Sequence, residues 1–128
     1  MSECIKLSSN AKQHTTAGPY SPVLEIEGKK LVVISGAAAI DMDGSIVGDT
    51  IEQQAEKTLD NCLAQLRSAD CSFQDVFKVN VFMKDLGEWG RFNEVYKERM
   101  PQPFAVRTAV QVGLLPGLLV EIEMWAVK

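Results

Sequence analysis

In the stretch DVFKVNVFMKD, residues 75 to 85, apolar and polar side chains alternate along most of its length. A period of two is typical of a β-strand whose two faces differ. One face carries Phe77, Val79, Val81 and Met83, and the other carries Lys78, Asn80, Phe82 and Lys84. The segments before and after this stretch have helical spacing, so the pattern predicts a sheet whose strands alternate with helices.

Two amphipathic helices are predicted beside this strand. Upstream, apolar residues recur every three or four positions, and Thr50 with Gln53 can form a capping box, which predicts a helix of about five turns. Its buried stripe comprises Ile51, Ala55, Leu59, Cys62 and Leu66. Downstream, EWGRFNEVYKERM (88 to 100) predicts a shorter helix that ends at Pro101 and Pro103. Its predicted core residues are Trp89, Phe92 and Tyr96.

The remaining strands are predicted as two hairpins. Residues 23 to 27 and 31 to 37 flank a GKK turn, and residues 104 to 112 and 118 to 126 flank a loop with Pro116 and Gly117. The order ββαβαββ predicts one α+β domain, residues 1 to 128, with both helices on one sheet face. We expect copies of the chain to cover the other face by homo-oligomerisation.

Composition bounds the class of protein. The apolar fraction of 46% and the charged fraction of 23% are typical of a soluble globular chain. The net charge of −4 does not favour nucleic acid or anionic lipid as a partner. The three cysteines lack CxxC spacing and are expected to be reduced thiols. No apolar presequence or run of about 20 apolar residues is present, so we expect a cytoplasmic protein with no membrane partner.

An arginine interrupts the predicted strand FAVRTAVQV, residues 104 to 112. Alternation places Arg107 on one face with Ala105 and Ala109, and Glu121 on the charged face of the last strand, so the two side chains can lie near each other. A guanidinium between small neighbours can hold a carboxylate through two parallel hydrogen bonds. An ordinary interface salt bridge from Arg107 to Glu121, Glu123 or a neighbouring subunit's acid explains the same pattern. Neither residue alone establishes a function.

Several short motifs occur together in order along the chain. They are GPYS (18 to 21), SG (35 to 36), LDN (59 to 61), DVFKVNVFMKDL (75 to 86), FNEVY (92 to 96), VRTAV (106 to 110) and LPG with VEIE (115 to 123). With these motifs the chain resembles the RidA/YjgF family of reactive-intermediate deaminases from about residue 17 to residue 127. The resemblance implies a chorismate-mutase-like α+β fold, assembled as a homotrimer whose sheets form a central barrel with three clefts between subunits.

The resemblance also implies an activity and a site. Members hydrolyse 2-imino and enamine acids, such as 2-aminoacrylate and 2-iminobutanoate, to a 2-keto acid and ammonia. By motif, Arg107 anchors the substrate carboxylate, Glu121 orients the hydrolytic water, and Tyr20 closes the cleft. Ser35, Gly36 and Asn93 would also line it. An iminium carbon is already electrophilic, so positioning and one proton-transfer group are sufficient, and we expect no metal or cofactor.

Some positions depart from the family pattern. Ala37 follows Ser35 and Gly36 where glutamine is common, Ala105 and Val106 precede Arg107 in place of Pro-Ala, and Ala109 stands where cysteine is common. These changes bear on substrate preference more than on the class of reaction. Pro22 and Asp70 replace a usual glutamine and a usual glycine, and Asp tolerates the left-handed conformation that a helix end requires.

Two other functions remain open at this point. The family includes members described as endoribonucleases or translation inhibitors under the L-PSP name. This chain has a single histidine, His14, expected at the surface, and so has no histidine pair for acid–base cleavage of RNA. A non-catalytic trimeric protein, binding small ligands or acting like a chaperone, would keep Arg107 but would not depend on Glu121.

Overall fold

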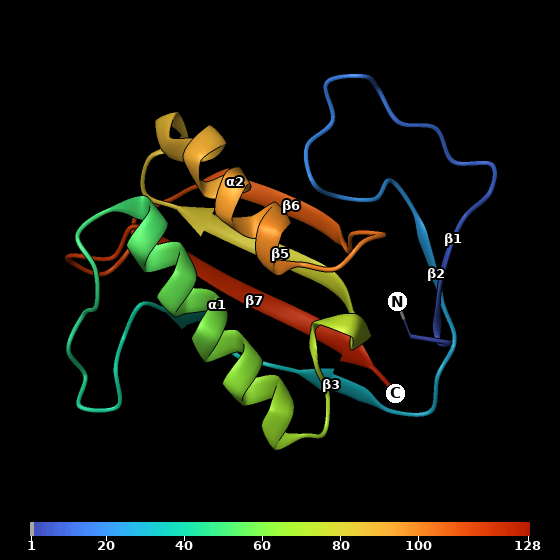
Figure 1. Cartoon of the computed structure of the whole chain (residues 1–128), viewed down its shortest axis with the longest axis horizontal. Coiled ribbons are helices and arrows are strands. Elements are labelled where there is room, and N and C mark those ends of the chain that lie inside the picture. Colours follow the sequence, from blue (N-terminus) through green and yellow to red (C-terminus); the bar gives the residue numbers. More distant parts are fainter. Residues whose placement is uncertain (1) are drawn as a thin grey trace.

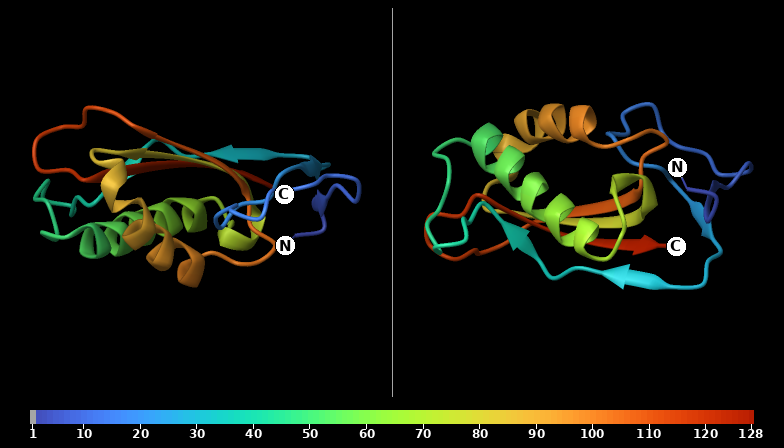
Figure 2. Two further views of the ribbon diagram at one scale, coloured as in Figure 1. Left: turned by 90° about the horizontal axis from the view of Figure 1, so that it is seen from above. Right: turned by 60° about the horizontal axis from the view of Figure 1, so that its bottom comes forward.

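A mixed β-sheet carries both helices on one face (Figures 1 and 2), in a computed structural model that describes residues 2–128. The strand order in this sheet is β3-β7-β5-β6, and the short strand β4 also pairs with β7. These strands are β3 (Leu31–Val33), β4 (Ala37–Ala38), β5 (Val76–Met83), β6 (Val106–Gln111) and β7 (Val120–Val127). The chain also forms a small sheet from β1 (Ile5–Leu7) and β2 (Leu24–Ile26). The helices are α1 (Ile51–Ser68) and α2 (Trp89–Arg99), and η1 (Phe73–Asp75) and η2 (Leu86–Glu88) are short 3₁₀ turns.

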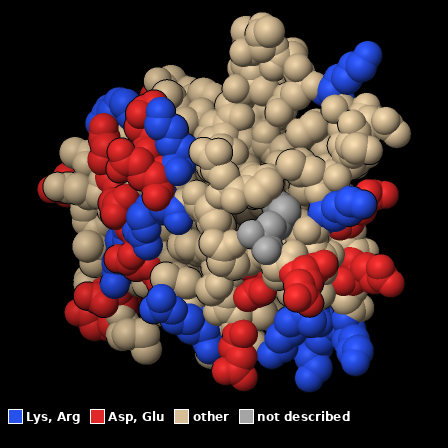
Figure 3. Space-filling model, turned by 45° about the vertical axis from the view of Figure 1, so that its right-hand side comes forward, with Lys and Arg blue, Asp and Glu red and all other residues tan. Residues whose placement is uncertain are grey.

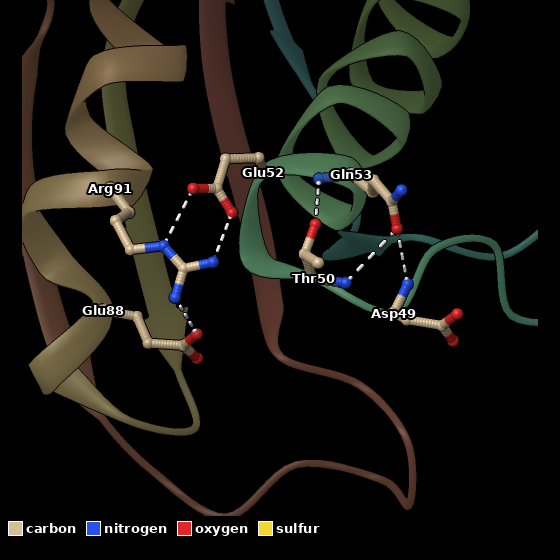
Figure 4. A network of polar contacts seen from close by, with 6 residues as sticks. All are labelled: Asp49, Thr50, Glu52, Gln53, Glu88 and Arg91. Atoms are coloured by element: carbon tan, nitrogen blue, oxygen red, sulfur yellow. Dashed lines mark hydrogen bonds and ion pairs between the residues drawn. The ribbon is translucent and has the colours of Figure 1, made fainter.

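The local signals for α1 are confirmed. The Thr50 hydroxyl accepts a hydrogen bond from the Gln53 backbone N–H at 3.2 Å, and the Gln53 side chain accepts from the backbone of Asp49 at 2.8 Å (Figure 4). All residues of the predicted stripe, from Ile51 to Leu66, are buried. Beyond the helix end Asp70 adopts a φ of 59°, the left-handed conformation expected there.

Ion pairs hold α2 against α1. The Arg91 guanidinium donates two hydrogen bonds to the Glu52 carboxylate, at 2.8 and 2.6 Å, and also pairs with Glu88 at 3.4 Å (Figure 4). Arg99 pairs with Glu56 at 3.1 Å and with Asp60 at 2.7 Å at the other end of α2. Exposed pairs each contribute at most about 1 kcal/mol, so they add to the burial of Phe92 and Tyr96, which packs α2 against the core. The position of α2 matters because this helix supplies side chains to the candidate site.

The core lies between the helices and the sheet. Val79, Val81 and Met83 of β5 are fully buried, which confirms the alternation predicted for this part of the strand. At Phe77 the prediction was wrong, because the register with β7 shifts between Val76 and Lys78. Val76 therefore takes the core position, and Phe77 is half-buried.

The first predicted hairpin does not form. β2 pairs with β1, which was not predicted, and β3 pairs with β7. A Cβ added at Gly28 would lie 2.3 Å from a methyl carbon of Val127, so the chain passes tightly over the end of β7 at that point. The backbone N–H groups of Lys29 and Lys30 donate to the Lys128 carbonyl at 3.1 and 2.9 Å. The GKK segment thus links two sheets instead of turning within one.

The second predicted hairpin is also wrong. β6 runs parallel to β5, and β7 lies antiparallel on the other side of β5 (Figure 1). The reason is that α2 forms a crossover between β5 and β6, which makes that pair parallel. Residues 112 to 119 then carry the chain past the end of β5, and β7 becomes an inner strand. Neither helix within residues 2–128 is long and apolar enough to cross a membrane.

Candidate active site

Arg107 lies on β6, an edge strand, and points to the side of the sheet that the helices cover. Its register partner is Val79, a fully buried core residue, and paired residues of neighbouring strands face the same way. The guanidinium carbon lies 4.6 Å from the ring centroid of Tyr96, 4.7 Å from that of Trp89 and 5.6 Å from that of Tyr20. The side chain is therefore enclosed by three aromatic rings.

The charge of Arg107 has no hydrogen-bonding counterpart among residues 2–128. Its two terminal nitrogens are buried and have no hydrogen-bond partner among residues 2–128, and no ion pair of these residues includes Arg107. Burial lowers the pKa of Arg107 from its ordinary value, while Tyr96 and Tyr20 act in the opposite direction. The ordinary pKa of arginine is so high that the group remains a cation at neutral pH. A buried cation without a partner is costly, so the surroundings of Arg107 suit an anion.

Two more predicted site residues lie beside Arg107. The GPYS segment is fixed to the start of β6, because the Ser21 hydroxyl donates to the Phe104 carbonyl and the Ser21 N–H donates to the Ala105 carbonyl at 3.2 Å. This anchor holds Tyr20 near the guanidinium. A Cβ added at Gly18 would lie 3.6 Å from Nη2 of Arg107 and 3.7 Å from Nδ2 of Asn93.

Asn93 contributes an acceptor with no partner. It comes from the second turn of α2, and its Oδ1 atom is buried without a hydrogen-bond partner among residues 2–128. The structure thus brings Tyr20, Asn93 and Arg107 together. We call these three residues with Gly18 the arginine half-site.

The other predicted residues form a second group. Glu121 lies on β7, in register with Phe82 of β5 and Ala38 of β4. A Cβ added at Gly36 would lie 2.7 Å from Oε2 of Glu121, so the carboxylate packs directly against the Gly36 backbone. Ser35 is adjacent and exposed. We call Ser35, Gly36 and Glu121 the glutamate half-site.

The expectation that Arg107 and Glu121 share a sheet face was wrong. Val79 pairs with both Arg107 and Met124, so Arg107 faces the helices. Glu121 has the opposite parity to Met124 on β7 and faces away from the helices. Alternation within each strand was predicted correctly, but it does not give the register between strands. The same geometry rules out a salt bridge between Arg107 and Glu121 within one chain, and Glu123 instead accepts from Asn80 at 2.9 Å.

Two neighbours of the arginine half-site were missed. Trp89 was predicted as a core residue, yet it is only half-buried and its ring covers the Arg107 guanidinium. His14 is exposed as expected, but its Nε2 lies 3.4 Å from the Tyr20 hydroxyl and its Nδ1 lies 2.8 Å from the Thr16 hydroxyl. Only the path of the loop brings His14 there, so the sequence pattern carried no signal for it.

A metal ion would need several side chains of the described residues to lie together as its ligands. No group of three or more His, Cys, Asp or Glu side chains within residues 2–128 is placed to hold a metal ion. The cysteines are free thiols, and Cys62 and Cys71 are buried. Burial raises the pKa of the Cys62 thiol to about 12, so it is not a reactive thiolate at neutral pH.

The chain is thus a small α+β protein in which the terminal nitrogens of one buried arginine have no hydrogen-bond partner among residues 2–128, and a glutamate lies on the opposite sheet face. A family model described as "Endoribonuclease L-PSP" matches residues 11–128. The chain belongs to this family, the RidA/YjgF family, and the α+β fold predicted from the resemblance is confirmed.

Relatives cover nearly the whole chain. The protein named "Protein mmf2, mitochondrial" from Schizosaccharomyces pombe is 36% identical over 127 residues, which cover 96% of this chain and 98% of that protein. The 2-iminobutanoate/2-iminopropanoate deaminase of Homo sapiens is 33% identical over 131 residues and covers 100% of this chain and 94% of its own. The solved structure of RidA from an Antarctic Psychrobacter has a TM-score of 0.74 and 32% identity, and covers 80% of this chain and 85% of that chain.

Proposed function

We propose that this protein hydrolyses reactive 2-imino and enamine acids to 2-keto acids and ammonia. The observation that carries the proposal is the Arg107 guanidinium, a buried cation between three aromatic rings whose terminal nitrogens have no hydrogen-bond partner among residues 2–128. Its planar fork matches the two oxygens of a carboxylate. Relatives that carry the deaminase name support the assignment of the reaction.

The proposed site forms between subunits of a homotrimer. Arg107 and Glu121 face opposite sides of the sheet, so they can act on one substrate only if they come from different chains. The sheet face away from the helices supports this assembly, since Val33 and Trp125 are 60% and 37% exposed there. One subunit would supply the arginine half-site and its neighbour the glutamate half-site.

The chemistry follows from these positions. With the carboxylate held on Arg107, the imine carbon lies in the cleft, where Glu121 accepts a proton from a water molecule that adds to the carbon–nitrogen double bond. Proton transfer to nitrogen then allows the carbon–nitrogen bond to break. The electron pair of that bond leaves with ammonia, and the carbon keeps the water oxygen as the keto group. Water is the only co-reactant.

Substrate entry requires the loop to move. In the described conformation the segment from Gly18 to Tyr20 lies against Nη2 of Arg107. This segment belongs to the long connection between β1 and β2, which has no helix or strand of its own. We propose that it swings outward to admit the carboxylate and closes over the bound substrate.

The family name also raises the alternative of an endoribonuclease. The net charge of −4 and the single histidine weigh against it. On the face seen in Figure 3, Lys and Arg side chains are interspersed with Asp and Glu rather than forming a continuous basic surface. An RNA affinity that falls steeply with salt would favour this alternative over the deaminase.

The test generates 2-aminoacrylate or 2-iminobutanoate in place with a serine/threonine dehydratase, follows keto-acid formation, and traps free imine with semicarbazide. We expect the wild type to accelerate keto-acid release. Arg107→Ala should raise KM about 10- to 100-fold, because a charge-assisted pair is lost. Glu121→Gln should lower kcat about 100-fold or more. If the wild type has no effect, the deaminase proposal fails, and retained binding of 2-oxobutanoate by both wild type and Glu121→Gln would indicate a non-catalytic binding protein.

A further inference from the structure

A shallow apolar recess lies beside Arg107. Leu86, Trp89 and Ala109 line a space of about 350 Å³. Ala109 follows Arg107 by two positions on β6, so the two side chains share the helix-covered face. Trp89 joins the recess to the arginine half-site, because its ring centroid is also 4.7 Å from the guanidinium carbon.

Hydrogen bonds hold the recess in shape. The Gln111 side chain accepts a hydrogen bond from the Leu86 N–H at 2.9 Å and so ties the η2 turn to the edge strand. Asp85 accepts from the Gly87 N–H at 2.8 Å and caps the same turn. Both hydrogen bonds fix the η2 turn that forms one side of the recess, and the residues that line the recess carry no charged side chain.

The size of the recess depends on Ala109. A methyl group fills only a small part of 350 Å³, given that one water in the liquid occupies about 30 Å³. Side chains two apart on a strand are separated by about 6.6 Å, which is comparable to the length of a 2-imino acid with a branched side chain. A carboxylate on Arg107 can therefore direct the remainder of the same molecule over Ala109.

We propose that this recess binds the substrate side chain, and that the preferred substrates are 2-imino acids with branched aliphatic or aromatic side chains. The inference rests on the proposed function, because Arg107 must hold the carboxylate. Trp89 forms the wall shared by both parts of the site, and Ala109 forms the floor. Each methylene buried in the recess increases affinity about fourfold.

The first test compares rates. 2-Imino acids with methyl, isobutyl and benzyl side chains are generated in place by an amino-acid oxidase, and keto-acid release is followed. We expect the wild type to favour the isobutyl or benzyl substrate over the methyl one by at least tenfold in kcat/KM. Ala109→Leu should abolish this preference by filling the recess. Ala64→Leu, the same change at an exposed position on α1, serves as the matched control and should keep the ratio.

The second test does not depend on turnover. The chain has two tryptophans, Trp89 and Trp125, so Trp125→Phe leaves Trp89 as the only one. Its fluorescence is titrated with pyruvate and with 4-methyl-2-oxopentanoate, and the larger acid should bind at least tenfold more tightly. Adding Ala109→Leu should remove that difference.

The outcomes separate the two proposals. If no imine is hydrolysed but the larger keto acid binds more tightly than pyruvate, the deaminase proposal fails and the assignment of the recess as a side-chain site is supported. If the methyl substrate is hydrolysed and neither test shows a preference that Ala109→Leu removes, the recess assignment is overturned and the deaminase proposal stands. Equal binding of both acids together with burial of the recess by a second copy of the chain would also overturn it.

Discussion

Gly36 is the residue with the least room for change in the glutamate half-site. Because an added Cβ would lie 2.7 Å from Glu121 Oε2, Gly36→Ala should push the carboxylate out of position. We expect at least a tenfold loss of turnover, since small displacements of catalytic groups are costly, and less than about 1 kcal/mol loss of stability, since only a side-chain end must move. Steady-state kinetics and urea unfolding measure the two effects.

Gly113→Ala is the matched control for this prediction. A Cβ at Gly113 meets nothing within 4 Å, so the same substitution should leave the kinetics unchanged. Wild-type turnover in Gly36→Ala would mean that the position of Glu121 does not matter, which would contradict its proposed role.

The Cys62 thiol should make the free energy of unfolding fall at alkaline pH. Burial raises its pKa from 9.0 to about 12, so the folded state keeps the proton that the unfolded state releases. The resulting contribution to the free energy of unfolding is fully present below pH 9 and is lost as the pH rises from 9 toward 12. At pH 10 the wild type should have lost unfolding free energy on the order of 1 kcal/mol through this group.

Cys62→Ala tests that dependence. The variant loses packing at every pH, but it lacks the titration, so the difference in unfolding free energy between it and the wild type should narrow by on the order of 1 kcal/mol between pH 7 and pH 10. Urea unfolding at the two pH values measures this difference. A difference that stays constant would show that Cys62 does not titrate differently in the two states.

Among the elements, α1 is fixed to the strand connections by one buried side chain. The Gln54 amide donates to the carbonyls of Gly48 at 3.1 Å and Gly117 at 2.9 Å, and accepts from the Leu119 N–H at 2.8 Å. Removing it leaves buried backbone groups without partners, each costing about 1 to 3 kcal/mol. We expect Gln54→Ala to lower the free energy of unfolding by about 3 kcal/mol or more.

Gln65→Ala provides the comparison within the same helix. Gln65 is exposed, so its replacement should change the unfolding free energy by less than about 0.5 kcal/mol. Thermal or urea unfolding of both variants gives the difference directly. Similar small losses in the two variants would show that Gln54 is not a structural link.

The elements also show what the sequence can predict. The cap at Thr50, the buried stripe of α1 and the alternation in β5 depend on neighbouring residues, so local spacing predicts them. Strand pairing depends on contacts between distant segments, and both predicted hairpins were wrong for that reason. Tyr20, Asn93 and Arg107, which the motifs single out, lie together in the structure, whereas Ser35, Gly36 and Glu121 lie apart from them. The placement of Trp89 and His14 beside Arg107 and Tyr20 depends on the folded loop and helix.

The sheet face that the helices do not cover is predicted to form the subunit contact. Val33 is 60% exposed and pairs with Trp125 on that face. Val33→Glu should place a charge in the contact and dissociate the assembly, with loss of deaminase activity because no cleft is completed. Met42→Glu is the control, since Met42 is fully exposed on a turn and should keep both assembly and activity.

Analytical ultracentrifugation and circular dichroism decide this prediction. We expect Val33→Glu to sediment as a folded monomer and Met42→Glu to sediment as the wild type does. A folded, fully active Val33→Glu monomer would contradict a site shared between subunits.

Arg107 and Glu121 lie on opposite faces of one chain, and we propose that they act together across a subunit boundary. One experiment mixes equal amounts of the two impaired variants, Arg107→Ala and Glu121→Gln, and lets them exchange subunits. Activity is measured at a substrate concentration below the wild-type KM, where both variants are nearly inactive, and native mass spectrometry confirms the mixed assemblies. If each cleft takes its arginine from one chain and its glutamate from the next, random mixing in equal amounts completes about one cleft in four, so the total activity should rise to about one quarter of the wild-type value. Mixed assemblies that remain inactive would contradict the claim.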